Sequence, residues 1–591
     1  RGTRQSAHNM LHVLLALAWR GPPVQYRARA GTAAGRVRAA VTVDGSCELD
    51  DPAVLCTYDP LAIDARFADR QWEVFGRVGG VGLAAFRVWC AGNDDGATLR
   101  AELSKLGPVF CKVGQTMATR PDIVGLETSR SLGQLQDAME PEADPATAMA
   151  TLRSALGGEA TLSARLRNIS AAPVAAASLA EVYRANLPDG TPVAVKVQRP
   201  GLERKVALDF YVMRRILALV QERFELGEDV QQVVAVLDEV GEGIFAELDF
   251  ATEAGHMRRF QRLYGERLHE LGVLVPTVVD ELVSARVLVT HWIDGTPPRQ
   301  LEPRARRDLA RTAVRCLAMQ LMSDGFIHCD PHEGNLLGLP DGRLALLDFG
   351  LMAQMRADHQ EAMAHGVVNI LGENYEALEQ VFRGMGVLDP SVDDLRRPGT
   401  SEPFAQALQA CMSGGAASAA AEAVPAAATT VAEPAGAGGA PTPKARQKIV
   451  QAADGPDRRR AFGQLYEELG ELAFRYYFVI PSYYILVMRS FVTLEGIALS
   501  ADDEFNMYEA TAPYALRKLL TPRTQGGRAL LRSAFLTATG RQALRQALSA
   551  RALATLLRRL LQELNPLRRA RRLLRAAGQR VRQARVAALE G

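Results

Sequence analysis

The spacing of apolar residues predicts a mostly helical chain with a few short strands near its middle. Apolar side chains recur at helical spacing from residue 57 to roughly residue 166, and the same pattern returns from 203 to 260. The run Val193–Gln198 lies between a Pro-Asp-Gly turn and Pro200, which predicts a short buried strand. Arg286–Trp292 predicts a second strand. The Asp-Gly-Thr-Pro-Pro segment that follows is typical of a hinge between lobes.

The second half of the pattern is again helical, with one hairpin and one break. Helical spacing resumes from Pro303 to Gly325, and a Pro-Asp-Gly turn then separates two short apolar runs, 336–337 and 344–347. Residues 413–443 are almost wholly Ala, Gly, Pro, Thr and Ser. Such a segment cannot bury enough apolar surface to order itself, so we interpret it as a disordered insertion.

Charge is balanced overall but unevenly distributed. The chain has 69 Lys and Arg against 67 Asp and Glu, a net charge of +2, yet it has no acidic residue before Asp44. This Arg- and Ala-rich start is typical of an organelle transit peptide, with a disordered basic tail as the alternative. The other end is also basic: leucines at helical spacing over 553–564 have arginines off the stripe. That pattern suits an anionic lipid surface, although a solvated helix or a nucleic-acid contact would give it too.

Cysteines and apolar runs set the expected environment. The seven cysteines are scattered and have no zinc-ligand spacing, which favours a reducing compartment. There is no uninterrupted run of 18 apolar residues, and the longest apolar stretches, 10–19 and 476–488, are too short to span a bilayer. We therefore expect a soluble or peripheral protein.

Two motifs carry the chemistry. His-Cys-Asp-Pro-His-Glu-Gly-Asn at 328–335 is followed by Asp-Phe-Gly at 348–350. Phosphoryl transfer needs a carboxylate to orient the acceptor hydroxyl and oxygen ligands for Mg²⁺. Asp330 would be the catalytic base, and Asn335 and Asp348 the metal ligands. Either motif alone arises by chance, but the two at this spacing, downstream of a strand with a lysine, indicate a kinase-like site.

Lys196 lies in the predicted apolar strand, where its ammonium requires a partner. In kinases such a lysine meets the nucleotide phosphates and a helix glutamate. On one continuous helix Asp249 and Glu253 would share a face, whereas Glu247 and Glu253 would lie about 240° apart. The two glutamates should therefore have different partners. A solvated helix face is the alternative for any one of these acids.

The glycine-rich loop of ordinary kinases is absent. No Gly-x-Gly-x-x-Gly precedes the Lys196 strand, and Pro-Val-Ala-Ala-Ala-Ser at 173–178 stands in its place. The Gly76–Gly82 segment lies too far upstream to serve. The chain resembles the UbiB/ADCK family of atypical kinases, in its plant and algal plastid form, over roughly residues 55 to 520 without the insertion. The resemblance rests on the Ala-Ala-Ala-Ser loop, Glu-x-Asp at 247–249, Lys-Val-Gly-Gln at 112–115, Thr-Arg-Pro-Asp at 119–122, Leu-Gln-Asp at 135–137, Gln-Arg-Pro-Gly at 198–201 and Leu-Glu-Gly at 494–496.

This resemblance implies roles for further residues. Lys112 would pair with Glu247, Lys196 would pair with Glu253, and Gln115 would restrain phosphoryl transfer at the pocket. The nucleotide phosphates would be covered by Ala175, Ala176, Ala177 and Ser178. Three positions depart from the family pattern: Ala180-Glu181 replaces Gly-Gln, Glu333 replaces a common proline, and His291 replaces a hinge glutamate.

The implied fold class is α+β: a bilobal protein-kinase-like fold with a helical N-terminal extension carrying Lys-x-Gly-Gln and a mostly helical C-lobe. We expect a transit or disordered segment at 1–50, the extension at 51–166, the N-lobe at 167–294 and the first part of the C-lobe at 295–412. The insertion at 413–443, C-lobe helices at 444–520 and a basic helical tail at 521–591 complete the chain.

The resemblance also implies a role. The preferred hypothesis is an enzyme that uses ATP or ADP with Mg²⁺, a kinase or ATPase supporting plastoquinone, tocopherol and related prenyl-lipid metabolism in the chloroplast, at plastoglobules or the thylakoid periphery. A mitochondrial location is the alternative. Expected partners are the nucleotide, quinone-biosynthetic proteins and a membrane surface at the basic tail, with no nucleic acid. A nucleotide-binding scaffold without catalysis is the second hypothesis, and a small-molecule phosphotransferase is the third.

Overall fold

The computed structural model describes most of the chain between residues 58 and 536. The described residues are 58–92, 96–118, 126–132, 135, 145–176, 179–224, 228–371, 374, 376–388, 392, 394–397, 400–413, 472, 475–478, 482–502 and 505–536. The expected transit segment, residues 414–443 of the expected insertion and the leucine stripe of the tail lie outside these ranges. So do the Thr-Arg-Pro-Asp motif, Gln136-Asp137, Ala177 and Ser178.

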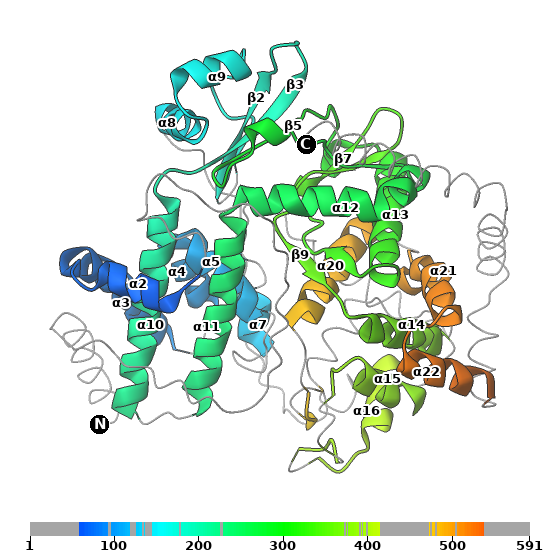
Figure 1. The fold of residues 1–591 in the computed structure, drawn as a ribbon. Helices are drawn as coiled ribbons and strands as arrows, with labels where there is room; N and C mark the ends of the chain where they lie inside the picture. The colour runs from blue at the N-terminus through cyan, green and yellow to red at the C-terminus, as the bar shows by residue number, and fades with distance from the viewer. Residues whose placement is uncertain are drawn as a thin grey trace, which may run out of the picture. The chain divides into compact units, whose positions relative to one another are not determined.

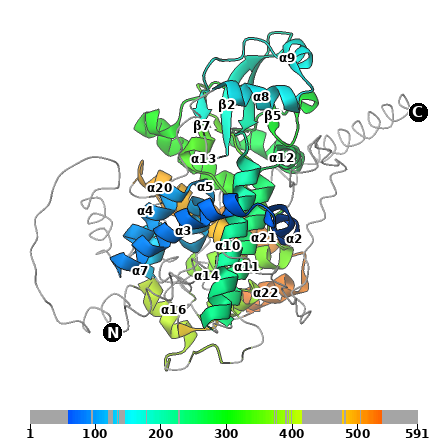
Figure 2. The same ribbon diagram turned by 90° about the vertical axis from the view of Figure 1, so that its left-hand side faces the viewer.

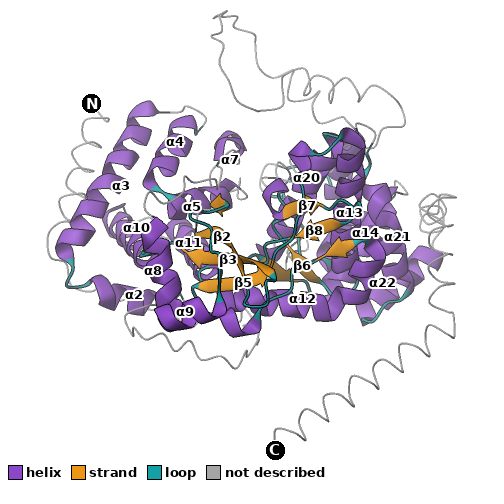
Figure 3. Ribbon diagram, turned by 90° about the horizontal axis from the view of Figure 1, so that it is seen from above, coloured by secondary structure: helices purple, strands orange, loops and turns teal. Residues whose placement is uncertain are grey.

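The chain forms two compact units, each with its own core. The first comprises residues 1–266, 274–296 and 345–352, and the second comprises 267–273, 297–344 and 353–591. Helices dominate both, and the strands are short (Figures 1 and 3). The first unit thus combines the segments expected as the extension and the N-lobe with the Asp-Phe-Gly turn.

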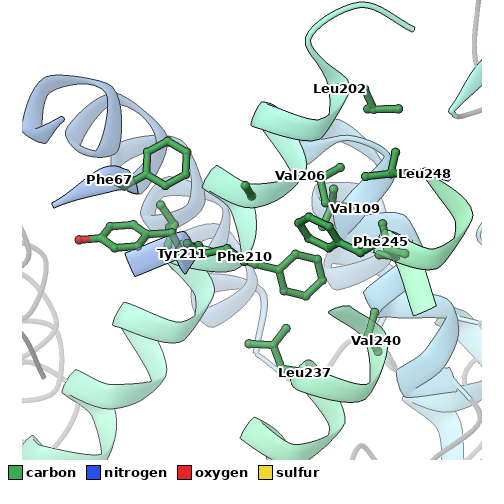
Figure 4. Packing of buried hydrophobic residues seen from close by; sticks show 14 of the residues in the cluster. Phe67, Val109, Leu202, Val206, Phe210, Tyr211, Leu237, Val240, Phe245 and Leu248 are labelled. Atoms are coloured by element: carbon green, nitrogen blue, oxygen red, sulfur yellow. The ribbon is translucent and has the colours of Figure 1, made fainter. Parts of the chain in front are cut away.

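Ten helices are described for the segments of the first unit, and one core of aliphatic and phenylalanine side chains joins several of them. They are α2 (Pro60–Phe67), α3 (Gln71–Ala91), α4 (Ala97–Leu106), α5 (Pro108–Ala118), α7 (Leu126–Leu132), α8 (Pro145–Ala155), α9 (Glu159–Arg165), α10 (Leu202–Phe224), α11 (Glu228–Glu247) and α12 (Phe250–Leu271), whose last turn belongs to the second unit. The buried side chains of Phe67, Val109, Phe210 and Phe245 come from α2, α5, α10 and α11 (Figure 4). This core fixes α5 against α11.

A four-stranded antiparallel sheet carries the predicted lysine. Its strands are β1 (Ala175–Ala176), β2 (Ala180–Asn186), β3 (Pro192–Gln198) and β5 (Val287–His291), in the order β1-β2-β3-β5. In the register, Lys196 lies between Val182 and Leu288. One face of the sheet packs on α8 and α9, which lie beside it in Figures 1 and 2. Both strands predicted from the sequence are present, whereas β2 was not predicted.

The helical segment 203–260 is not one helix, which corrects the face argument made from the sequence. Helix α11 ends at Glu247, and α12 begins at Phe250. Asp249 caps α12: its carboxylate accepts hydrogen bonds from Ala251 N (3.0 Å) and Thr252 Oγ1 (2.7 Å). Aspartate is a strong N-cap because it satisfies amide groups that lack partners in the first turn. Asp249 is therefore the cap of the helix that carries Glu253, and Glu247 belongs to the preceding helix.

The second unit consists mainly of helices, with a few short turns between them. Its helices are α13 (Pro303–Met322), α14 (Ala357–Leu371), α15 (Glu376–Gly384), α16 (Phe404–Ser413), α20 (Ser482–Leu499), α21 (Met507–Leu520) and α22 (Gln525–Leu536), with 3₁₀ turns η2 (Pro298–Gln300) and η3 (Glu333–Asn335). The 3₁₀ turn η1 (Asp280–Leu282) belongs to the first unit. A buried Lys518 of α21 donates to Gln360 Oε1 of α14 at 2.6 Å, which ties these two helices together.

The predicted hairpin is present. Its strands are β7 (Leu336–Gly338) and β8 (Leu344–Leu346), and Leu339 N donates to Arg343 O at 2.8 Å across the turn. The remaining short strands are β4 (Val273–Leu274), β6 (Phe326–His328) and β9 (Met352–Gln354). They form the small sheets β4-β8-β7 and β6-β9.

Candidate active site

The centre of the candidate site in the first unit is an ion-paired lysine. Lys196 Nζ donates to both carboxylate oxygens of Glu253, at 3.0 and 2.8 Å, and to Asp348 Oδ2 at 2.7 Å. The Glu253 side chain is only 4% exposed, whereas that of Asp348 is 38% exposed. One cation thus holds together two carboxylates, and the carboxylate of the Asp-Phe-Gly turn is the one that solvent reaches.

Burial and charge act against each other on these groups. Burial by itself lowers the pKa of Lys196, but Asp348 and Glu253 outweigh it and raise that pKa above its usual range. Burial raises the pKa of Glu253, and the neighbouring Asp348 adds to this rise against the opposing effect of Lys196. Lys196 therefore stays charged, which suits it to hold an anionic group.

Helix α12 anchors the Asp-Phe-Gly turn through three further contacts. Phe349 N donates to Glu253 Oε1 at 3.3 Å, and the Phe349 ring packs edge-on against Phe260 with 5.0 Å between centroids. His256 Nδ1 lies 3.0 Å from Phe349 O. Because a carbonyl only accepts, His256 is the donor, and burial lowers its pKa so that the ring is neutral.

Sequence reasoning did not identify His256 or Phe260. The signal was available, since residues 253, 256 and 260 follow one helix face at spacings of three and four.

The Lys-x-Gly-Gln helix contacts the other glutamate. Lys112 of α5 forms an ion pair with Glu247 at the end of α11, and both side chains are largely buried. A Cβ at Gly114 would lie 2.5 Å from Leu135 Cδ1 and 2.8 Å from Leu103 Cδ1, so a larger residue would require these leucine side chains to shift. Gln115 Nε2 donates to Leu135 O at 3.2 Å. The two lysines therefore have separate glutamate partners, the pairing that the resemblance implies.

The alanine-rich segment that replaces the glycine loop begins as a strand. Ala175 and Ala176 form β1, opposite Val182 and Glu181 of β2. Glu181, which replaces a family glutamine, is buried and accepts a hydrogen bond from Tyr183 Oη at 2.8 Å. This departure is therefore accommodated inside the sheet. His291, the third departure, is an exposed residue at the end of β5, where its backbone N bonds Thr277 O.

The second unit contains the Asp330 loop. Asn335 Nδ2 donates to Asp330 O at 3.0 Å, and Asn335 N donates to His332 O at 2.9 Å, so the loop is closed on itself. The Asp330 carboxylate lies 3.6 Å from Arg489 Nη2 of α20 and 3.7 Å from His332 Nε2. Arg489 was not predicted as a site residue, because no local spacing connects it with Asp330.

The remaining departure also finds partners. Glu333 pairs with Arg299 and, at 3.3 Å, with Arg306. A glutamate at this position therefore anchors the loop to η2 and α13 instead of projecting unpaired beside the candidate metal ligands.

The predicted site residues are therefore divided between the two units. Lys112, Glu247, Lys196, Glu253 and Asp348 belong to the first, with β1 of the alanine-rich loop. Asp330 and Asn335 belong to the second. Among the described residues no group of three or more His, Cys, Asp or Glu side chains could hold a metal by itself. A sheet lysine paired with a helix glutamate and with the Asp-Phe-Gly aspartate, together with the Asp-x4-Asn loop, defines a kinase-like protein.

Comparisons with known proteins are consistent with this class. Residues 134–382 match the ABC1 atypical kinase-like domain. The chain is 33% identical over 464 residues to the Arabidopsis thaliana protein ACTIVITY OF BC1 COMPLEX KINASE 3, chloroplastic, covering 76% of this chain and 58% of that protein. It is 34% identical over 436 residues to the protein slr1919 of Synechocystis, covering 72% of this chain and 67% of that protein.

A solved structure is also similar. The complex of Rv3197 with erythromycin from Mycobacterium tuberculosis superposes with a TM-score of 0.44 at 22% identity, over 71% of this chain and 94% of that one. The chain belongs to the ABC1/UbiB family of atypical kinases. It spans little more than half the length of the Arabidopsis relative.

Proposed function

We propose that this chain is an ATP-binding atypical kinase or ATPase that requires Mg²⁺. The observation that carries the proposal is the contact of Lys196 with both Glu253 and Asp348. In kinases these three groups are the phosphate-binding lysine, the helix glutamate that orients it and the metal-binding aspartate. Lys196 remains charged in its buried setting, and a triphosphate would supply it with additional anionic partners.

The donor chemistry fits magnesium bound together with nucleotide phosphates. Mg²⁺ is usually held by one or two carboxylates, with substrate phosphates and water completing its shell. Asp348 supplies a partly exposed carboxylate and Asn335 an amide oxygen, so a dedicated all-protein cage is not required. Bound Mg²⁺ would neutralise charge that develops on the transferred phosphoryl group. Asn335 would hold it from the Asp330 loop, and Asp348 from the Asp-Phe-Gly turn.

Asp330 would orient and deprotonate the hydroxyl or water that accepts the phosphoryl group. Its loop is held by Asn335, and its carboxylate faces the guanidinium of Arg489. Lys112 and Glu247 would bring the Lys-x-Gly-Gln helix to the nucleotide, where Gln115 would restrain transfer. Ala175 and Ala176, with Ala177 and Ser178, would cover the phosphates.

A nucleotide-binding scaffold without phosphoryl transfer is the second candidate. The arginine opposite Asp330 favours it, because a carboxylate that faces a guanidinium is less available to an acceptor hydroxyl. A small-molecule phosphotransferase is disfavoured by the Lys112–Glu247 pair, since that helix belongs to the family signature.

The cellular role that we propose is support of isoprenoid-quinone and prenyl-lipid metabolism in the chloroplast, at plastoglobules or the thylakoid periphery. The name of the Arabidopsis relative as a chloroplastic kinase supports the location. The Arg-rich start of the chain supports it as well.

Nucleotide binding is tested with the variant Asp348→Asn. This change keeps the side-chain volume but removes a carboxylate, so we expect Mg-ATP affinity to fall at least tenfold, while ATP affinity in EDTA changes little. Titration of a fluorescent ATP analogue with and without Mg²⁺ measures both quantities. Unchanged Mg²⁺-dependent affinity would refute the metal assignment. The control Asp341→Asn alters an exposed aspartate of the β7–β8 turn.

Catalysis is tested separately with Asp330→Asn. The variant should bind Mg-ATP as the wild type does and lose phosphate release from ATP. Quinone and prenyl-lipid profiles of cells that carry this variant should then differ from those of wild-type cells. Lost phosphate release with a normal lipid profile would reject the metabolic role, whereas normal phosphate release would reject Asp330 as the base.

A further inference from the structure

Helix α3 exposes a concentration of large apolar side chains. Of the ten exposed large hydrophobic residues in the described part of the chain, five lie on this one helix. Trp72 is 88% exposed, Phe75 53%, Leu83 51%, and Phe86 and Trp89 42% each. Isolated exposed apolar residues are ordinary, but a contiguous set marks an interaction surface.

These side chains form one stripe along the helix. At 100° per residue, positions eleven apart differ by about 20°, so Trp72 lies in line with Leu83, and Phe75 with Phe86. Gly79 lies between these pairs on the same face, and a Cβ there would meet nothing within 4 Å. We call Trp72, Phe75, Gly79, Leu83 and Phe86 the α3 stripe. No charged residue belongs to it.

The opposite face of α3 belongs to the core of the first unit. Val78 is buried, and Val74 and Val81 pack against the same core cluster. One face of α3 therefore packs on the first unit, so lipid could not contact the helix on all sides. This matters because Gln71–Ala91 is the one helix in the described part of the chain that is long and apolar enough to cross a membrane. It contains no uninterrupted run of 18 apolar residues, since Glu73, Arg77 and Arg87 interrupt the sequence.

The charges beside the stripe have partners within the fold. Glu73 pairs with Arg204 at 2.5 Å, Arg77 pairs with Asp209, and Arg87 lies 3.1 Å from Glu102. The surroundings of the stripe are thus electrostatically balanced, so attraction to an acidic or basic partner does not account for it. A tryptophan on an apolar helix face, such as Trp72 at the start of the α3 stripe, is typical of residence at a membrane–water interface.

We propose that the α3 stripe inserts into the apolar layer of a lipid surface, with α3 lying in the plane of that surface. Insertion is driven by apolar side chains and does not require anionic lipid. This surface differs from the basic C-terminal tail, whose attraction to lipid would be electrostatic. The residues involved are separate from Lys196, Asp330 and Asp348, so failure of the proposed enzymatic function leaves this inference untouched.

The test is co-flotation of the full chain with vesicles of uncharged phosphatidylcholine, at low salt and at 0.5 M salt (about a 4 Å Debye length). Wild type should float equally in both. Gly79→Glu places a charge in the centre of the stripe without removing a contact, and should abolish flotation. Gly265→Glu is the matched control on α12, another exposed helical glycine with nothing within 4 Å, and should float as wild type does. Trp72→Ser with Phe86→Ser should lower the partition coefficient about 100-fold, at roughly tenfold for each aromatic ring.

The outcomes separate the possible occupants of the stripe. Flotation of Gly79→Glu at the wild-type level, or absence of wild-type flotation, would overturn the proposal. Flotation that requires anionic lipid and disappears at high salt would assign the contact to the basic tail instead. A wild-type dimer in sedimentation that Gly79→Glu dissociates, without vesicle binding, would show that a second copy covers the stripe. Mg-ATP binding and far-UV circular dichroism verify that each variant is folded.

Discussion

Replacing Glu253 with glutamine tests how strongly the Lys196 cluster stabilises the first unit. Glu253 accepts three hydrogen bonds, two from Lys196 Nζ and one from Phe349 N. Glutamine has one acceptor oxygen, and its NH₂ group must face one of these donors. At least one charge-assisted hydrogen bond is therefore lost, at a cost of about 1.5–3 kcal/mol.

The loss of charge adds to this cost, but Asp348 limits it. Removing one partner from an isolated buried ion pair costs roughly 3–5 kcal/mol, because the remaining charge is uncompensated. Here Lys196 keeps Asp348 at 2.7 Å, and its own side chain is 19% exposed. We therefore expect Glu253→Gln to lower the free energy of unfolding by about 3 kcal/mol in total, at the low end of that range.

The four tryptophans of the chain make the measurement specific. Trp72, Trp89 and Trp292 are described residues of the first unit, and no tryptophan falls in the segments of the second unit, so tryptophan fluorescence during urea unfolding reports on the first unit. The exposed Glu242→Gln on α11 is the control and should change the free energy of unfolding by less than about 0.5 kcal/mol.

A double variant gives the sharper check. Lys196→Met with Glu253→Gln removes both charges, so its cost should be smaller than the sum of the two single costs by more than about 1 kcal/mol. Additive costs, or a Glu253→Gln variant as stable as the control, would refute the reasoning that this carboxylate compensates the buried lysine.

Two further predictions concern stability. Gly114→Ala should lower the free energy of unfolding by about 1–3 kcal/mol, because its methyl would overlap Leu135. Gly76→Ala, on the open face of α3, should raise the free energy of unfolding by about 0.5–1 kcal/mol. Urea unfolding followed by fluorescence compares the two variants, and changes of the same sign would contradict the packing argument. Burial lowers the pKa of His365 to about 4, so the unfolded chain takes up a proton below pH 6.5 that the folded chain resists, and stability is lost as pH falls. Urea unfolding followed by circular dichroism at pH 7 and pH 5 measures this loss. Between these pH values the free energy of unfolding of His365→Gln should fall by about 2 kcal/mol less than that of wild type, while the exposed His269→Gln should match wild type. Identical pH dependence of all three proteins would exclude His365 as the cause.

The sequence allowed prediction of elements whose signal is local. The β7–β8 hairpin and the strand of Lys196 follow from short apolar runs bounded by turn residues, and the structure has both. Strand β2 was missed although its buried and exposed positions alternate over part of its length. Its sequence mixes Ala, Glu, Arg and Asn with only Val and Tyr as strand formers, so local propensity does not indicate a strand. Pairing with β3 along seven positions determines its conformation instead.

Long-range contacts of the candidate site could be predicted only where a family pattern, or the requirement of a buried charge for a partner, pointed to them. The buried ammonium of Lys196 required a partner, and Glu253 provides one. Nothing comparable indicated Arg489, because an arginine that closes an apolar stretch is ordinary at a helix surface. Its contact with Asp330 depends on how α20 packs within the second unit, which no local spacing determines.

The two glutamates show how a sequence argument can predict separate partners correctly through an incorrect intermediate. Placing Glu247 and Glu253 on one helix separates them by about 240°, which suggested different partners. The structure breaks the helix at Leu248-Asp249, where the Asp249 side chain starts a new one. A continuous helix would fix the angle between the two carboxylates, so any shift of one would turn the other. With the break, Glu247 remains with α11 and pairs with Lys112, while Glu253 belongs to α12 and holds both Lys196 and the Asp-Phe-Gly turn. Asp249 is therefore a structural residue whose capping bonds allow each glutamate to be oriented by its own helix.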